Sequence, residues 1–107
     1  MRPIRIYLSG PITGIDDYME RFLETEARVK RQWNEVLNPA KVGKMLPVLG
    51  HSEYMTIDLA MLKICDVILL MKGWQQSKGC MEEYEFAKEH GIMIVEESNE
   101  DEESESV

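Results

Sequence analysis

Short apolar runs alternate with longer amphipathic stretches along this chain. Runs of β-branched and other apolar residues predict strands at 4–8, 36–38, 66–71 and 92–95. Apolar residues at helical spacing predict helices over about 16–34, 52–64 and 79–90. Residues 40–51 include two glycines and a proline, and we expect them to form a loop, with one helical turn as an alternative.

The helix ends carry signals of their own. Asp16 or Asp17 can cap the first helix and Ser52 the second, and Gly91 stands where the last helix should end. Strands that are apolar on both faces and alternate with helices are typical of a parallel sheet covered on both sides. Each connection should then be a right-handed crossover. We therefore expect one α/β domain over residues 1–95.

The net charge of −8 is unevenly distributed over the 107 residues. Seven of the 20 acidic residues and none of the 12 basic residues lie in 96–107, which leaves 13 acids against 12 bases elsewhere. Such an acidic run repels itself and has little apolar surface to bury. We predict a disordered acidic tail over residues 96–107.

Composition disfavours several classes of partner. Because the chain has no strongly basic patch, duplex nucleic acid is not an expected partner. It has no apolar run of about 18 residues and no signal-peptide pattern, so we expect a cytoplasmic protein without a membrane span. Cys65 and Cys80 lack metal-ligand spacing and are expected to be reduced thiols. Only two histidines accompany them, so no metal site and no cofactor are implied.

One predicted strand-to-helix turn concentrates residues that could carry chemistry. Residues 73–83 follow the apolar run 66–71 and lead into the last helix. Ligands of open α/β sheets bind at such carboxyl ends of strands. We interpret Gly79 as the residue that permits the bend and Glu83 as a candidate nucleophile or general base. A phosphoacceptor receiver domain is excluded, because residues 71–73 offer no aspartate at the end of this strand.

Two carboxylates are candidates for that chemistry. Helical spacing predicts that Glu83 faces inward, whereas Glu82 and Glu85 point outward. The dipole at the helix N-terminus should favour the ionised form of Glu83. Asp58 lies in the most apolar helix, where an acid must be paired, protonated or functional, although an exposed position on the helix edge is an equal alternative. Two acids in different environments suit cleavage of a glycosidic bond.

The turn after the first strand is a second candidate element. Its backbone amides, from Ser9 to Gly14, could hold a phosphate or a sugar hydroxyl, and its glycines allow close backbone approach. A plain tight turn explains the same residues equally well. Tyr7, at the end of the strand, could hydrogen-bond the region of the nucleophile or serve only as a core tyrosine.

These motifs occur in an order that resembles a known superfamily. The segments are Tyr7–Gly14, Tyr54-Met55 with Asp58, Cys65–Leu70, and Gly73-Trp74 with Ser77-Lys78-Gly79 and Glu83. They are similar to the nucleoside 2-deoxyribosyltransferase-like superfamily, closest to its small phage and bacterial members of unknown function. The resemblance covers residues 4–95. It implies a three-layer Rossmann-like (flavodoxin-like) sandwich with a small, four- to five-stranded parallel sheet.

The resemblance also implies roles for individual residues. A glutamate four residues after the loop glycine is the superfamily's nucleophile, which corresponds to Glu83 after Gly79. Asp58 would contact the sugar or assist departure of the nucleobase, and Tyr7 completes the expected catalytic set. The expected substrate-binding residues are Ser9, Gly10, Pro11, Ile12, Gly14, Trp74, Ser77 and Gly79.

Ser77 bears on the substrate. Members that act on nucleosides have an aspartate six residues before the nucleophile, and members that act on 5′-monophosphates have a serine there. A hydroxyl can donate to a phosphate, which a carboxylate would repel. Lys78 could add positive charge or simply face solvent. Relatives form dimers or higher assemblies, so a homodimer or larger homo-oligomer is expected.

Two functional hypotheses follow. The first is an enzyme, an N-glycosidase or 2-deoxyribosyltransferase that acts on nucleosides or nucleoside 5′-monophosphates through a covalent glycosyl-glutamate intermediate. The second is a non-catalytic module that binds a nucleotide in the same pocket. The short length of the chain motivates the second hypothesis.

Overall fold

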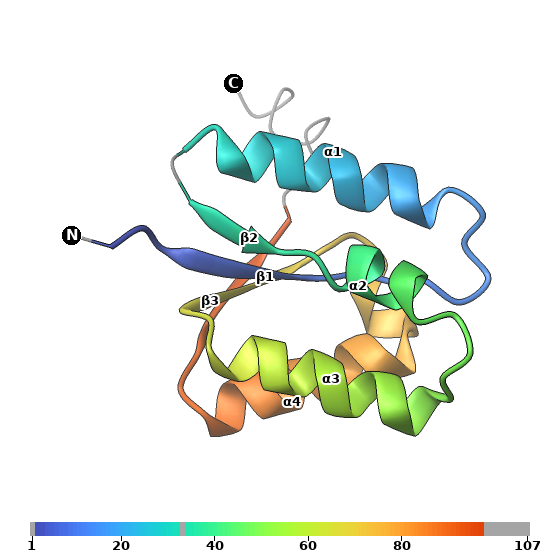
Figure 1. Ribbon diagram of the computed structural model, residues 1–107. Coiled ribbons are helices and arrows are strands. Elements are labelled where there is room, and N and C mark those ends of the chain that lie inside the picture. The colour runs from blue at the N-terminus through green and yellow to red at the C-terminus, as the bar shows by residue number, and fades with distance from the viewer. Residues whose placement is uncertain (1, 33, 98–107) are drawn as a thin grey trace.

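The computed structural model describes residues 2–32 and 34–97 (Figure 1). Strands and helices alternate along the chain, with two helices in succession between the second and third strands. In chain order the elements are β1 (Arg5–Ser9), α1 (Tyr18–Lys30), β2 (Glu35–Leu37), α2 (Pro39–Met45), α3 (His51–Lys63), β3 (Val67–Leu70), the 3-10 turn η1 (Trp74–Gln76), α4 (Lys78–Glu89) and β4 (Met93–Glu96).

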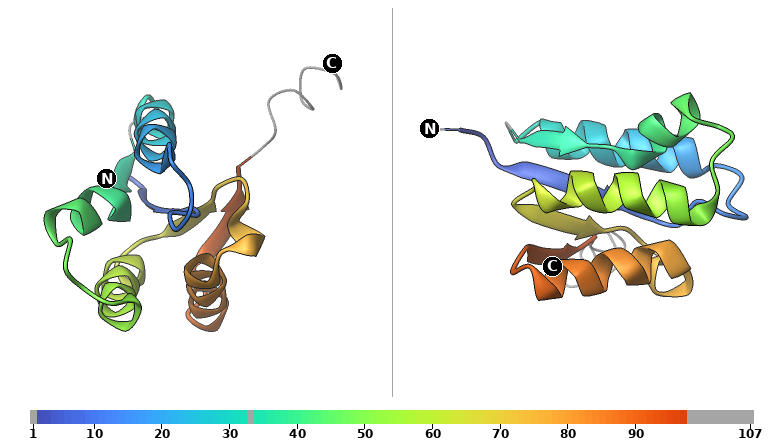
Figure 2. Two further views of the ribbon diagram at one scale, coloured as in Figure 1. Left: turned by 90° about the vertical axis from the view of Figure 1, so that its right-hand side faces the viewer. Right: turned by 60° about the horizontal axis from the view of Figure 1, so that its bottom comes forward.

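The described strands form one parallel sheet in the order β2-β1-β3-β4. α1 covers one face of this sheet, and α3 and α4 lie side by side on the other (Figures 1 and 2). The three-layer, flavodoxin-like sandwich with a small parallel sheet is thereby confirmed, with four strands in the described part of the chain.

Alternation along the strands divides the core between the two faces. Tyr7 packs on the α3 and α4 side with Ile68, Leu62 and Ala87, all fully buried. Leu8, the next residue, packs on the α1 side with a set that includes Phe22, Ala40 and Met71. Neighbouring residues of a strand point to opposite faces, so β1 contributes one side chain to each cluster.

The topology creates a crevice at one edge of the sheet. The chain moves from β1 outward to β2, then crosses back over β1 to reach β3. The connections that leave β1 and β3 therefore run to opposite faces of the sheet. In such sheets the carboxyl ends of the two strands flank a ligand-binding crevice. Figure 2 shows the first turns of α3 and α4 at this same end of the molecule.

The largest departure from the sequence-based prediction is α2, a helix where a loop was expected. Asn38 caps it by accepting hydrogen bonds from the amides of Ala40 (2.9 Å) and Lys41 (3.4 Å), and Pro39 occupies the first turn. Asparagine at the cap followed by proline is a strong helix-start signal. The helix is short and depends on packing against α1 rather than on a long apolar stripe of its own.

Smaller corrections concern helix ends. α1 ends at Lys30, about four residues earlier than predicted, and Asp17 at its cap position makes no side-chain hydrogen bond to the helix. α3 begins at His51, so Ser52 lies inside the helix, and the cap position is Gly50. Gly91 follows α4 with a φ of 67°, the left-handed conformation expected after a helix.

The domain continues beyond its predicted boundary at residue 95. Glu96 is the last residue of β4, and the amide of Glu97 donates to the carbonyl of Leu70 at 2.7 Å. The Glu97 carboxylate accepts hydrogen bonds from Thr25 and Arg28 of α1, so these two acids do not belong to a disordered tail. Residues 98–107, the rest of the predicted tail, lie outside the described residues. None of the described helices is long and apolar enough to cross a membrane.

Candidate active site

Glu83 lies in the second turn of α4 and is 5% exposed. Both of its carboxylate oxygens accept hydrogen bonds from β1. The Ser9 hydroxyl donates to Oε1 at 2.6 Å, and the Tyr7 hydroxyl donates to Oε2. Tyr7 and Ser9 occupy alternate positions of the strand, so both side chains point to the α4 face. The inward orientation predicted for Glu83 is confirmed.

The environment of Glu83 acts on its pKa in two directions. Burial raises the pKa because the charged form loses hydration, and the hydrogen bonds from Ser9 and Tyr7 partly offset this by favouring the carboxylate. The negative charges of Asp58 and Glu82 raise it further, and the resulting pKa is about 7. The sequence-based argument from the helix dipole did not include burial, and with a pKa of about 7 Glu83 is only about half ionised at neutral pH.

Asp58 projects from α3 toward the same space. It is partly buried, and this burial raises its pKa to about 6, with a small opposing effect from His51. The negative charge of Asp58 in turn raises the pKa of Glu83 and of Tyr7, so the ionisation of the three groups is coupled. Two carboxyl groups that titrate near neutrality in one crevice are a signature of acid-base sites.

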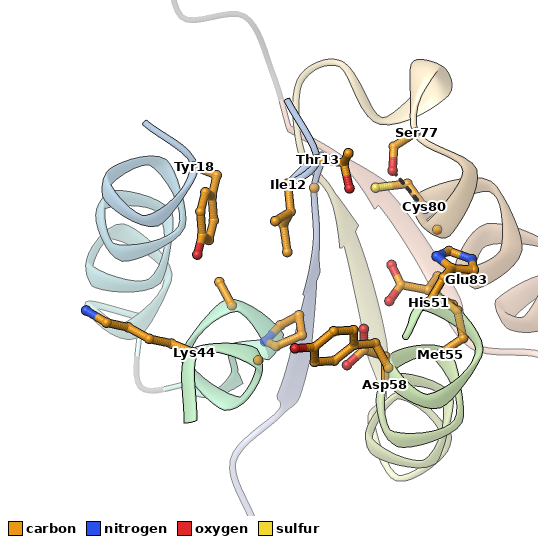
Figure 3. A pocket seen from close by; sticks show the side chains of 16 residues that line it. Ile12, Thr13, Tyr18, Lys44, His51, Met55, Asp58, Ser77, Cys80 and Glu83 are labelled. Atoms are coloured by element: carbon orange, nitrogen blue, oxygen red, sulfur yellow. Dashed lines mark hydrogen bonds between the residues drawn. The ribbon is translucent and has the colours of Figure 1, made fainter. Parts of the chain in front are cut away.

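A pocket of about 260 Å³ connects these groups. Figure 3 shows Asp58 and Glu83 reaching into it, with Tyr18 and Lys44 on the opposite side. The lining comes from the turn after β1, from the start of α1, from α2, and from the N-terminal halves of α3 and α4. The full set is Gly10, Ile12, Thr13, Tyr18, Pro39, Ala40, Gly43, Lys44, His51, Tyr54, Met55, Asp58, Ser77, Gly79, Cys80 and Glu83.

The structure brings most of the predicted site residues to this pocket. Glu83, Asp58, Gly10, Ile12, Ser77 and Gly79 line it. Tyr7 and Ser9 are fully buried behind Glu83 and contact that carboxylate rather than the open space. Gly10 packs so closely on Met71 that an added Cβ would lie 2.8 Å from its sulfur, and this explains the glycine without any special backbone angle.

Other predicted residues lie elsewhere. Pro11 lines a neighbouring cavity, and Gly14 supplies a turn with a φ of 79° but lines neither cavity. Trp74 also lines neither; its ring contacts Tyr84, and its indole N–H donates to Glu96 at 3.2 Å. The bend itself is made by Gly73 with a φ of 85°, so the bending role assigned to Gly79 is corrected. Gly79 sits inside α4, where an added Cβ would contact Met55 at 3.5 Å.

Sequence reasoning missed several lining residues. His51, Tyr54 and Met55 share the inner face of α3 with Asp58, at spacings of three, four and seven residues. Tyr54 and Met55 already lay in the predicted helix, where that periodicity could have found them, whereas His51 preceded its predicted start at residue 52. Glu82 is more exposed than Glu83 and lies 3.4 Å from the His51 ring, and Glu85 pairs with Lys88 at 3.6 Å on the outer face.

No group of three or more potential metal ligands is present within residues 2–32 and 34–97. Both cysteines are free and buried. Burial raises the pKa of the Cys80 thiol, which lines the pocket one turn before Glu83. Cys80 is therefore protonated near neutral pH, and a protonated thiol is a weaker nucleophile than a thiolate.

Fold and site together define an α/β protein of flavodoxin-like topology with two titrating carboxyl groups at the carboxyl end of its sheet. The chain belongs to the family described as domain of unknown function DUF4406, whose model matches residues 4–96. No match was found among curated proteins. A solved structure described as 2-desoxiribosyltransferase from Leishmania mexicana resembles the chain with a TM-score of 0.69 and 19% sequence identity. The likeness covers 88% of this chain and 63% of that one, and at this identity it shows a shared fold.

Proposed function

We propose that this protein cleaves or transfers the N-glycosidic bond of a nucleoside or nucleoside 5′-monophosphate through a covalent bond to Glu83. The observation that carries the proposal is the position of the Glu83 carboxylate and its hydrogen bonding. Its two oxygens are held by Tyr7 and Ser9, and it faces a pocket that Asp58 also lines. The shared fold with a 2-desoxiribosyltransferase supports the same reaction class.

The proposed reaction proceeds in two steps. An oxygen of ionised Glu83 attacks C1′ of the sugar while the C1′–N bond breaks, and the electron pair leaves with the nucleobase. Protonated Asp58 supplies the proton that the departing base takes. Water then attacks C1′ of the glycosyl ester, gives its proton to Asp58 and releases Glu83. A second nucleobase in place of water would make the reaction a transfer.

The pocket dimensions agree with a compact ligand. A volume of about 260 Å³ lies just below the usual range for small-molecule sites. The aromatic rings of Tyr18 and Tyr54 offer apolar contact for a base, whereas the carboxyl groups occupy the end where the sugar would react. We place the base toward α2 and the sugar toward α4.

Release of free base tests the proposal. Purified protein is incubated with the common nucleosides and their 5′-monophosphates, and free base is followed by chromatography. We expect release by the wild type and none by Glu83→Ala, with Glu85→Ala as the matched control on the exposed face. Mass spectrometry of protein quenched during turnover should show an added glycosyl group that Glu83→Ala lacks. Equal release by Glu83→Ala would rule out the nucleophile.

The second candidate function is nucleotide binding without turnover. It is favoured by one observation, that the chain spans only 63% of the length of the solved structure it resembles. Ligand-dependent thermal stabilisation with no base release after long incubation would support this alternative. The predicted homodimer or larger homo-oligomer stays a prediction, and sedimentation equilibrium measures it directly.

A further inference from the structure

A second cavity of about 630 Å³ adjoins the candidate active site. It lies between the turn after β1 and the segment that joins β3 to α4. Arg21, Lys72 and Lys78 line it together with His51, and none of the described residues that line it is acidic. The described residues that line it are Pro11, Ile12, Thr13, Ile15, Arg21, His51, Lys72, Gly73, Gln76, Ser77, Lys78 and Gly79.

This concentration of positive charge stands out in an acidic chain. Outside residues 96–107 the protein carries 13 acids and 12 bases, so composition does not explain why the described lining of this cavity holds basic but no acidic residues. The nearby Glu97 carboxylate does not line the cavity, because Arg28, Thr25 and the Lys72 amide bind it. A cavity lined by one sign of charge concentrates ligands of the opposite sign.

The cationic side chains are also partly positioned. The Arg21 guanidinium donates to the Lys72 carbonyl at 3.3 Å, which places it against the segment that follows β3. This contact uses one of its five N–H donors. The planar guanidinium matches phosphate oxygens in geometry, and lysine ammonium groups bind phosphate as point charges. The chemistry of the lining therefore favours a phosphate group over a neutral ligand.

The two cavities share part of their lining. Both are lined by Ile12, Thr13, His51, Ser77 and Gly79. The Ser77 hydroxyl therefore stands at the junction, with Glu83 and Asp58 on one side and Arg21, Lys72 and Lys78 on the other. A nucleoside in the small pocket with its 5′ end at Ser77 would direct any further 5′ substituent into the basic cavity.

We infer that the preferred form of this substrate carries two or more phosphates at its 5′ end, as in a nucleoside 5′-diphosphate or triphosphate. This inference rests on the proposed function, because it takes the reacting sugar to lie beside Glu83. The first phosphate reaches Ser77 at the junction, and the second and third occupy the space between Arg21, Lys72 and Lys78. A nucleoside or monophosphate that ends at Ser77 would place no phosphate beside Arg21 and Lys78.

Binding measurements test the inference separately from catalysis. Titration calorimetry on the Glu83→Ala protein compares each common 2′-deoxynucleoside with its mono-, di- and triphosphate, in EDTA so that no divalent cation masks the phosphates. For the base that binds, we expect the triphosphate to bind at least ~10-fold more tightly than the monophosphate, the effect of one charge-assisted contact. The double variant Arg21→Gln/Lys78→Gln should lose that preference and keep the affinity for the nucleoside.

The matched control is Arg31→Gln/Lys63→Gln, which removes two exposed cations that line neither cavity. It should keep the preference for triphosphate. Equal affinity for mono-, di- and triphosphates, or an unchanged preference in the cavity double variant, would overturn the inference. Base release from nucleosides at the same kcat/KM as from triphosphates would overturn it while leaving the proposed function intact. Triphosphate preference without any base release would instead reject the catalytic proposal alone.

Discussion

Ser9 and Glu83, separated by 74 positions, are joined by a hydrogen bond of 2.6 Å between the last residue of β1 and the second turn of α4. Tyr7 binds the other oxygen of the same carboxylate. One strand therefore fixes both oxygens of the buried acid. The two hydroxyls also partly compensate for its burial, since they favour the charged form that burial disfavours.

Replacing Ser9 by alanine should raise the pKa of Glu83 above its value of about 7, because a hydrogen bond that favours the carboxylate is lost. A bond to a charged group contributes about 1.5–3 kcal/mol, which corresponds to a shift of roughly one to two pKa units. Because the reactive form is the minor arrangement of the Asp58–Glu83 pair, the falling limb of base release against pH should move upward by that amount and the maximal rate should fall. Ser52→Ala, on an exposed turn of α3, should leave the profile in place. An unshifted limb in Ser9→Ala would contradict this account of the hydrogen bond.

The pH dependence of kcat/KM should be bell-shaped, with apparent pKa values near 6 and 7 that belong to the Asp58–Glu83 pair. Since the pKa of Glu83 is about one unit higher, the reactive form, with Glu83 ionised and Asp58 protonated, is roughly a tenth as abundant as the opposite arrangement. The unliganded site thus favours the unreactive arrangement, and catalysis draws on the minor one.

Asp58→Asn separates the two roles considered for this residue. If Asp58 protonates the leaving base, the variant should lose the falling limb and about 10²–10⁴-fold in rate. Its single rising limb should have a midpoint below about 7, because the charge that raises the pKa of Glu83 is gone. A wild-type profile that rises and then stays flat to high pH would instead assign Asp58 to sugar binding.

Glu83→Gln should stabilise the fold at alkaline pH. The folded pKa of about 7 lies above the ordinary value of 4.5, so the stability of the wild type is fully present below pH 4.5 and declines as pH rises through 7. The penalty at pH 8 is on the order of 3 kcal/mol, the equivalent of that shift. Urea denaturation should therefore show a more stable Glu83→Gln variant at pH 8 and little difference at pH 4. Glu85→Gln, with a side chain 54% exposed, serves as the control. An equal gain in stability in this control would contradict the explanation that the buried charge of Glu83 destabilises the fold.

The overall fold could be predicted because its signals are local. Each strand is a short apolar run, and the parallel arrangement follows from helices between them. The inward position of Glu83 followed from helical spacing alone. Its pKa could not be predicted in the same way, because the burial and the hydroxyl partners come from β1, far away in sequence. The local argument from the helix dipole left out this burial, which raises the pKa.

The basic cavity escaped prediction for the same reason. Arg21, Lys72 and Lys78 belong to α1, the segment after β3 and the start of α4, so no basic run appears along the chain. Lys78 alone could be interpreted as a side chain that faces solvent. Trp74 shows the converse error: it sits in a motif near the site, yet its side chain packs on Tyr84 away from both cavities. Position in a motif did not determine where the side chain points.

The helix α2 depends on a buried acid of α1. Glu26 is 6% exposed and accepts hydrogen bonds from the Asn38 side chain at 2.9 Å and from Lys41 at 3.0 Å, with a salt bridge to Lys30 at 3.0 Å. Burial alone would raise its pKa, but these three partners outweigh burial and lower it to about 2. Asn38, which caps α2, is thus held by a residue twelve positions earlier, a contact that no local pattern reveals.

Glu26→Gln should therefore destabilise the protein at neutral pH by on the order of 2–3 kcal/mol, since the charged form is the one that the fold binds. Because the folded pKa lies below 4.5, this stability is present above pH 4.5 and is lost as pH falls toward 2, so the difference from wild type should narrow between pH 5 and pH 3. Urea denaturation across that range measures it, and Glu24→Gln, exposed on the same helix, is the control. Compared with the wild type, the variant should show its largest increase in backbone hydrogen exchange in α2. A loss of stability that stays constant from pH 7 to pH 3 would show that the glutamine destabilises the fold through its shape and not through the missing charge.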